Sequence, residues 1–190
     1  MNIQKIELPE QAVSRSVEII DKYYPAGELR DLLLTHSLYV ARKAMECVGR
    51  RGLDVDREFV VEAALLHDIG IFRTDAPGIH CHGTEPYICH GVIGRKLLDG
   101  LSMPRHALVC ERHTGAGLSV DDIISQNLPL PHRDMLPLTL EEKLICYADK
   151  FFSKSGNPEE EKELERVKRM MAKHGEATLA RFMELHALFC

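Results

Sequence analysis

The chain has 190 residues and a formal net charge of −5; 45% of its residues are apolar and 28% are charged. This composition is ordinary for a globular protein and excludes a largely disordered chain, and the length suits one compact domain. The negative charge excludes a broad cationic surface, so we expect a small-molecule ligand rather than an extended nucleic-acid surface or a membrane.

Targeting signals are not evident in the sequence. No apolar run approaches the roughly 20 residues that span a bilayer, and the start MNIQKIELPEQ lacks the basic flank and apolar stretch of a signal peptide. We therefore expect a cytoplasmic protein. The cysteines at positions 47, 81, 89, 110, 146 and 190 are dispersed without a C-x-x-C pair. We predict free thiols, with Cys47, Cys110 and Cys146 in the core.

Apolar residues recur at three- and four-residue intervals, and no stretch alternates as a half-buried strand would, so the pattern predicts an all-α fold. A first helix is predicted within residues 9–24 and a second over residues 28–50. In the second helix, His36 takes an inward position where an aliphatic residue would be usual. Asp56 is expected to cap a third helix that ends near Gly70.

The second half of the chain begins with residues 71–85, which lack periodicity and predict a long loop over a functional site. Residues 128–137 are rich in proline and predict an extended connection. The other segments predict helices with recognisable starts: from Glu85-Pro86 to about Asp99, from Pro104 to near His113, after Ser119, from Thr139 to a helix that carries Asp149, and from Asn157-Pro158.

Four polar residues lie among apolar neighbours on these helices: His36, His67, Asp68 and Asp149. A buried imidazole or carboxylate must be paired or coordinated, because leaving it alone in the interior costs on the order of 2–7 kcal/mol even for a neutral group. One such histidine alone would more often be a hydrogen-bonded core residue. Four together predict a shared metal ion.

These residues carry a resemblance to the HD superfamily of metal-dependent phosphohydrolases. His67-Asp68-Ile69-Gly70 within AALLHDIGIF is similar to its H-D-I-G motif, and His36 in LLLTHSLYVA and Asp149 in EEKLICYADKFF complete it in order. The resemblance implies a helical bundle with a metal site between core helices. It also implies one HD domain over residues 1–190, with a core at about 28–153, the N-terminal helix 9–24 and C-terminal helices within 158–189.

Two further histidines look similar to those of the binuclear branch: His90 in ICHGVIGRKLL and His113 in CERHTGAGL. That resemblance implies a second metal held by His90, His113 and a bridging Asp68. The chain also resembles HD-type hydrolases that split diadenosine tetraphosphate symmetrically, and uncharacterised HDIG proteins. It differs from those hydrolases in its 71–85 loop and in an insertion at 128–138, so the substrate stays open.

Imidazole and carboxylate ligands suit Fe, Mn, Co, Ni or Zn. Because a bound metal lowers the pKa of its water, the resemblance implies hydrolysis by a metal-activated hydroxide of a phosphoester or phosphoanhydride bond, in a nucleotide or a dinucleotide polyphosphate. Asp68 is the expected catalytic bridge, and Lys150 the first candidate for catalysis and substrate binding. Arg73 and Arg112 are further substrate-binding candidates, although either could be a surface arginine.

Several alternatives remain open. The chain could be a metal- and nucleotide-binding sensor or scaffold without turnover, or a protein that metal merely stabilises. His80-Cys81-His82 could form a separate soft-ligand site, but we favour a lid over the substrate. His174 has no partner pattern and is expected at the surface or in the core. The apolar residues Met170, Met171, Phe182, Met183 and 185–189 predict helix packing or the face of a homodimer.

Overall fold

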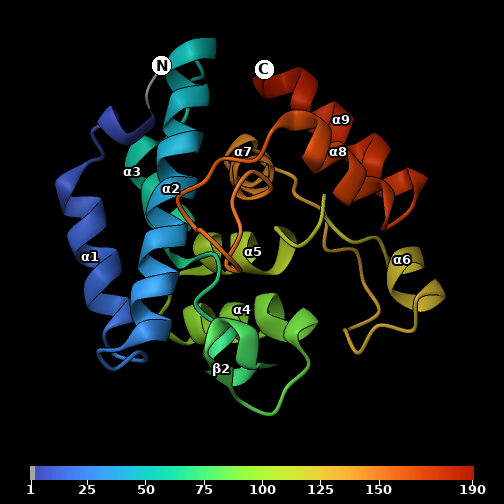
Figure 1. Cartoon of the computed structure of the whole chain (residues 1–190), viewed down its shortest axis with the longest axis horizontal. Coiled ribbons are helices and arrows are strands. Elements are labelled where there is room, and N and C mark those ends of the chain that lie inside the picture. The colour runs from blue at the N-terminus through green and yellow to red at the C-terminus, as the bar shows by residue number, and fades with distance from the viewer. Residues whose placement is uncertain (1–2) are drawn as a thin grey trace.

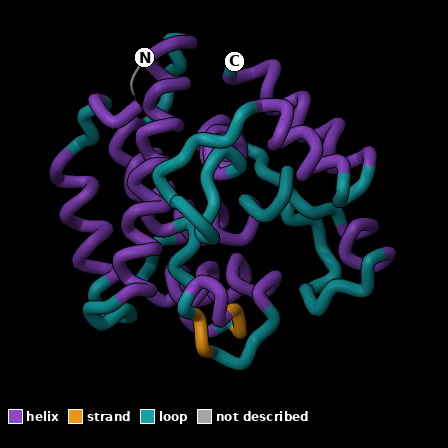
Figure 2. The backbone as a smooth tube through the Cα atoms, viewed as in Figure 1, coloured by secondary structure: helices purple, strands orange, loops and turns teal. Residues whose placement is uncertain are grey.

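The protein is described from a computed structural model that covers residues 3–190 and is built mainly of helices (Figures 1 and 2). This architecture confirms the predicted all-α fold. Within the described residues the helices are α1 (Glu10–Ile20), α2 (Glu28–Arg51), α3 (Arg57–Leu66), α4 (His90–Gly100), α5 (Pro104–Arg112), α6 (Val120–Ser125), α7 (Leu140–Asp149), α8 (Leu164–Ala172) and α9 (Glu176–Phe189). Short 3-10 turns lie at Ile3–Lys5, Ile71–Arg73, Pro77–Ile79 and Tyr87–Cys89.

Local capping sets the start of α3 and α7, two of the helices that position the metal-ligand candidates. The Asp56 side chain accepts a hydrogen bond from the Phe59 amide at 3.0 Å, at the start of α3. Thr139 Oγ1 accepts from the Glu142 amide at 3.2 Å, at the start of α7. Each bond satisfies an amide that the first helical turn leaves free. Both predicted caps are confirmed.

The core forms where α2, α3 and α7 pack together, with α5 and α9 against them. In Figure 1 α7 is seen nearly end on at the centre, with α1, α2 and α3 on one side and α8 and α9 on the other. Tyr147 of α7 stacks on Phe182 of α9, with ring centroids 5.7 Å apart. Burial of such side chains supplies most of the stabilising free energy. α7 therefore joins the two sides of the bundle.

Two predicted segments differ from the structure. Residues 71–85 are not wholly irregular, because β1 (Asp75–Ala76) and β2 (Cys81–His82) pair as a short antiparallel hairpin. The prediction of a helix from Asn157 is wrong, since α8 begins only at Leu164. The acidic residues after Asn157 bind another helix instead: Glu159 accepts from the Tyr39 hydroxyl and Glu161 pairs with Lys43.

Close backbone contacts hold α4 against its neighbours. A Cβ added at Gly70 would lie 2.2 Å from the His90 carbonyl oxygen and 2.6 Å from the Gly94 amide nitrogen. A Cβ at Gly91 would lie 2.5 Å from the Cys110 carbonyl oxygen, on α5. Glycine is needed at these positions because no side chain fits between the two backbones.

A buried carboxylate ties α4, α5 and the proline-rich connection together. Glu111 on α5 has a side chain only 1% exposed, and it pairs with both Arg95 of α4 and Arg133. We expect Glu111→Gln to lower the free energy of unfolding by about 2 kcal/mol. Breaking a fully buried ion pair would lower it further, but here both arginines reach solvent. Urea denaturation would measure it. Arg133→Gln is the control, since its half-exposed charge should matter less; an equal loss would contradict this account.

The described cysteines are free, and Cys47, Cys110 and Cys146 are buried as predicted. Phe182 and Phe189 of α9 are fully buried, so the C-terminal apolar residues serve at least in part as helix packing. The homodimer and the single-domain organisation stay predictions. No helix within residues 3–190 has the length and apolar character to cross a membrane.

Candidate metal centre

Four of the predicted ligands meet at one point although they come from three distant segments. His36 lies in the middle of α2, His67 and Asp68 directly follow α3, and Asp149 ends α7. Nε2 of His36 lies 3.3 Å from Asp68 Oδ2 and 3.1 Å from Asp149 Oδ1. Nε2 of His67 lies 2.9 Å and 3.4 Å from the same two oxygens. All four residues are buried.

The other two predicted ligands meet the opposite oxygen of Asp68. His90 is the first residue of α4, and His113 directly follows α5. Nε2 of each lies 3.4 Å from Asp68 Oδ1, and the two Nε2 atoms lie 3.1 Å apart. Asp68 thus faces one pair of histidines through each carboxylate oxygen.

Backbone contacts fix how three of these histidines are oriented. Nδ1 of His67, His90 and His113 lies 2.6, 2.7 and 2.8 Å from the carbonyl oxygens of Ala64, Tyr87 and Cys110, in each case three residues earlier. A carbonyl can only accept, so each Nδ1 carries the proton and donates it. In a neutral ring Nε2 then presents a lone pair, which is the arrangement usual for metal-binding histidine.

The donor set fits a metal ion. Around an ion with ligand bonds of about 2.0–2.2 Å, adjacent ligand atoms lie about 3.0–3.4 Å apart, close to the separations found here. Among the described residues, Asp68 Oδ1 and His67 Nε2 are buried without a hydrogen bond of normal geometry, and Asp68 Oδ2 has an ion pair with Lys154. Nε2 of His90 also faces Nε2 of His113, and two lone pairs at 3.1 Å repel unless a cation lies between them.

The protonation states support the same conclusion. Burial lowers the pKa of His113, and it lowers the pKa of His90 to about 3, so both rings are neutral. Burial opposes ionisation of Asp68 and Asp149, but nearby cations outweigh it and hold both pKa values well below the usual range. Burial likewise opposes a charge on His67, yet Asp68 raises the pKa of His67 to about 9. A metal at this position would displace that proton.

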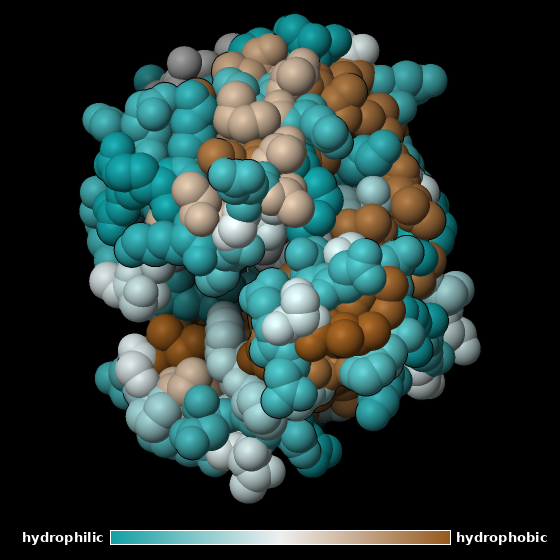
Figure 3. Space-filling model, turned by 90° about the vertical axis from the view of Figure 1, so that its right-hand side faces the viewer, coloured by the Kyte–Doolittle hydropathy of each residue, from teal (hydrophilic) through white to brown (hydrophobic). Residues whose placement is uncertain are grey.

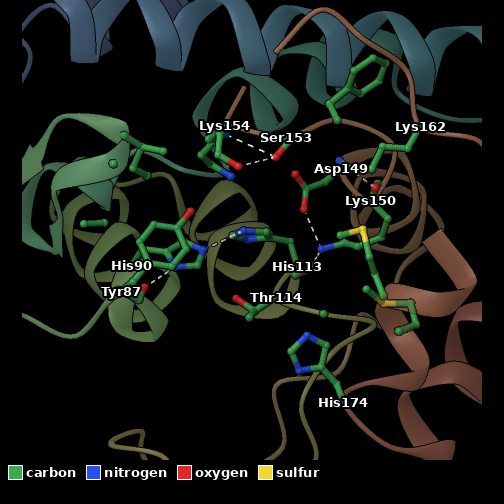
Figure 4. Close-up of a pocket in the computed structure, with 18 of the residues that line it drawn as sticks. Tyr87, His90, His113, Thr114, Asp149, Lys150, Ser153, Lys154, Lys162 and His174 are labelled. Carbon is green, nitrogen blue, oxygen red and sulfur yellow. Dashed lines mark hydrogen bonds and ion pairs between the residues drawn. The ribbon is translucent and has the colours of Figure 1, made fainter. Parts of the chain in front are cut away.

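Three of these residues, His90, His113 and Asp149, line a pocket of about 560 Å³. Figure 4 shows His90 and His113 pointing toward each other, with Lys150 and Lys162 beside Asp149. The face turned to the viewer in Figure 3 is hollowed, and apolar side chains lie among polar ones on it. The pocket walls combine cations with apolar groups: Lys150, Lys154 and Lys162, with Ile79, Phe152, Met170 and Met171.

Only one of the predicted cations lines this pocket. Lys150 Nζ lies 2.6 Å from Asp149 Oδ2 and donates to the His113 carbonyl at 3.0 Å. The structure does not bring the two arginines to the pocket. Arg112 pairs with Glu142 at 2.9 Å, and Arg73 lies over the Phe72 ring and lines a separate pocket.

The His80-Cys81-His82 segment forms no metal-ligand cluster with other described residues. Cys81 is buried in the second strand of the hairpin, and His80 is exposed and lies 3.3 Å from Glu28. The hairpin turn, residues 76–79, lines the pocket. Part of the loop therefore borders the pocket, and its role as a lid stays a prediction.

Sequence reasoning missed three residues that line the pocket. Lys154 lies 2.5 Å from Asp68 Oδ2, and Lys162 donates to the Lys150 carbonyl at 3.4 Å. Burial lowers the pKa of Lys162 to about 8. His174, expected at the surface or in the core, lies at the edge of the pocket just after α8. Lys154 stands close to Asp149 in the sequence, which was a visible signal. It follows the end of α7, however, where helix periodicity no longer shows which way a side chain points.

The fold and the donor set define an all-helical protein whose buried histidine and aspartate side chains fit a metal site. The sequence matches the HD domain family over residues 33–154, more than half of the chain. The chain therefore belongs to the HD domain family, whose members are generally metal-dependent hydrolases. No solved structure matches the chain significantly.

The chain is also similar to three archaeal proteins. An uncharacterised protein of Methanocaldococcus jannaschii is 40% identical over 121 residues, which are 62% of this chain and 64% of that protein. A tRNA (cytidine(56)-2'-O)-methyltransferase of Picrophilus torridus is 34% identical over 65% of this chain and 32% of its own length. The protein of that name from Thermoplasma volcanium is 31% identical over 70% and 35%. The chain thus spans less than two thirds of each relative.

Proposed function

We propose that the chain is a phosphohydrolase that uses two divalent transition metals to cleave a phosphoester or phosphoanhydride bond. The observation that carries this proposal is the shared carboxylate, because Asp68 faces His36 and His67 through Oδ2 and His90 and His113 through Oδ1. Pairs of metals at such sites are common among enzymes that hydrolyse phosphate esters.

The two donor sets have different sizes. His36, His67, Asp68 and Asp149 would hold one metal, and Asp68, His90 and His113 the other. Imidazole with carboxylate suits Mn, Fe, Co, Ni or Zn better than calcium, which prefers oxygen alone. When bound, such metals polarise phosphoryl oxygens and acidify water.

The lysines supply what a phosphorylated substrate needs from the protein. Phosphoryl transfer places negative charge on equatorial oxygens, and fixed cations stabilise it. Lys150 orients Asp149 through an ion pair of 2.6 Å. Lys154 and Lys162 line the same pocket, and Lys162 hydrogen-bonds the backbone of Lys150. We assign Lys150 to positioning of Asp149 and to binding of the phosphoryl group.

The pocket shape supports a nucleotide or dinucleotide polyphosphate as the first substrates to test. Its volume of about 560 Å³ lies within the range usual for small-molecule sites. Cations at the metal end suit phosphate, and Met170, Met171 and Phe152 suit an apolar or planar group. The methyltransferase name is not carried to this chain, because the alignments cover only about a third of those proteins.

The decisive test is metal content per chain, measured together with hydrolysis of mononucleotides and diadenosine tetraphosphate. We expect two metals in the native protein and one in His90→Ala, because His90 belongs only to the smaller donor set. Hydrolysis should fall by more than the roughly 10–100-fold that the loss of an outer-shell partner costs.

His132→Ala is the matched control, since His132 is exposed and away from the pocket. It should keep both metals and full hydrolysis. One metal in the native protein, unaffected by His90→Ala, would remove the second-metal assignment. Full metal occupancy with no hydrolysis of any substrate would instead identify a metal-binding sensor or scaffold.

A further inference from the structure

Lys154 is a nearly buried lysine placed directly on the bridging carboxylate. Its side chain is only 12% exposed, and Nζ lies 2.5 Å from Asp68 Oδ2. Burial opposes its charge, but Asp68 outweighs that effect and keeps the pKa of Lys154 above its usual value. A buried ammonium is stable only with such a partner. Asp68 therefore already has a cation beside it in the structure.

The segment that carries Lys154 is anchored elsewhere in the fold. It leaves α7 and runs along α2, where Glu159 accepts from the Tyr39 hydroxyl at 3.0 Å and Glu161 pairs with Lys43 at 2.6 Å. These contacts lie outside the pocket and do not involve the ligand candidates. Lys154 is thus directed to Asp68 by tertiary contacts of its own segment.

The ammonium group and a metal would share one oxygen. Asp68 Oδ2, which Lys154 contacts, is also the oxygen 3.3 Å from His36 Nε2 and 2.9 Å from His67 Nε2. A divalent cation held by those donors would lie close to the ammonium, and like charges repel strongly in a buried site. The Lys154 charge should therefore oppose metal binding.

The neighbouring lysine does not have this property. Lys150 contacts Asp149 Oδ2, whereas Oδ1 of Asp149 faces His36 and His67. Lys150 therefore binds the oxygen that points away from the donor set and leaves the other oxygen free for a metal. The two lysines, similar in sequence position, differ in which carboxylate oxygen they occupy.

We propose that Lys154 couples metal binding to phosphate binding. In the metal-free protein its ammonium neutralises Asp68 and opposes metal entry, and a phosphate anion in the pocket provides a second partner for it. The negative charge of the phosphate then offsets the repulsion between the ammonium and the metal. Phosphate should tighten metal binding, and metal should tighten phosphate binding by the same factor, because such coupling is reciprocal. The proposal rests on the proposed function only in taking phosphate as the anion.

The test is titration of chelator-treated protein with Mn²⁺ by calorimetry, with and without inorganic phosphate. In the native protein we expect phosphate to tighten Mn²⁺ binding by about tenfold, within the range usual for coupled sites. Lys154→Met should bind Mn²⁺ about tenfold more tightly than the native protein without phosphate. In that variant the effect of phosphate should become clearly smaller, because the part that runs through the ammonium is lost.

Three variants make the result specific. Lys154→Arg keeps the charge and should keep the coupling, and Lys154→Gln should repeat Lys154→Met if the methionine variant folds poorly. Lys150→Met should not tighten Mn²⁺ binding. Absence of a phosphate effect in the native protein, or unchanged or weaker metal binding in both neutral Lys154 variants, would overturn the proposal. Because every readout is binding, a failure to hydrolyse phosphoesters would overturn the proposed function and leave this inference standing.

Discussion

Replacing Asp68 with asparagine should leave no tightly bound metal at either donor set and reduce hydrolysis by on the order of 1,000-fold, the upper end for loss of one electrostatic group. Asp68 is the one residue common to both clusters found in the described residues. An amide keeps the shape but offers one acceptor oxygen and no charge, so it cannot serve His36 and His67 on one side and His90 and His113 on the other. Metal analysis of the purified variant measures the effect.

The same substitution should also lower the stability of the metal-free protein against unfolding. Lys154 would remain buried without its carboxylate, and breaking a buried pair on one side costs about 3 kcal/mol. Thermal unfolding after chelation would show it. Asp54→Asn changes an exposed aspartate and should alter neither metal content nor stability. A variant of Asp68 that still holds one metal per chain would show that the two sites do not depend on a shared bridge.

Gly70→Ala should lower the free energy of unfolding by about 3 kcal/mol, at the upper end for overpacking, because the new methyl group meets backbone rather than a movable side chain. The nearest atoms are the His90 carbonyl oxygen at 2.2 Å and the Gly94 amide nitrogen at 2.6 Å. α4 must then shift, and His90 shifts with it. We expect the metal of the smaller donor set to be lost preferentially.

Gly49→Ala is a close control for this prediction. Gly49 lies in α2 with no atom within 4 Å of an added Cβ. Because glycine is unfavourable inside a helix, alanine there should raise stability by roughly 0.5–1 kcal/mol. Urea denaturation and metal analysis of both variants separate the steric clash at Gly70 from the general effect of replacing glycine with alanine. Native stability with both metals retained in Gly70→Ala would contradict the packing argument.

The sequence predicted the features that depend on local pattern. Asp56 and Thr139 cap the expected helices, and the stripe that contains His36 faces the core. The ligand candidates also come together as the motif order implied. These predictions succeeded because helix periodicity determines which side chains point inward.

What could not be predicted depends on contacts between distant segments. The expected cap at Asn157 does not start a helix, because Glu159 and Glu161 bind α2. Lys154 follows a helix end, so nothing local shows that it reaches Asp68. Arg112 adjoins a ligand yet turns to Glu142, where it finds a buried carboxylate.

The pocket is made by two parts of the chain, and only one of them lies within the segment that matches the family. The metal end is built from residues within 33–154, which is also the segment that defines the family. The apolar wall contributed by Met170 and Met171 belongs to α8, which begins at Leu164, beyond that segment. None of the ligand candidates lies in α8, so a substitution at Met170 leaves every one of them in place. Exchanging α8 for that of a relative would therefore test whether this wall determines which ligand the pocket accepts.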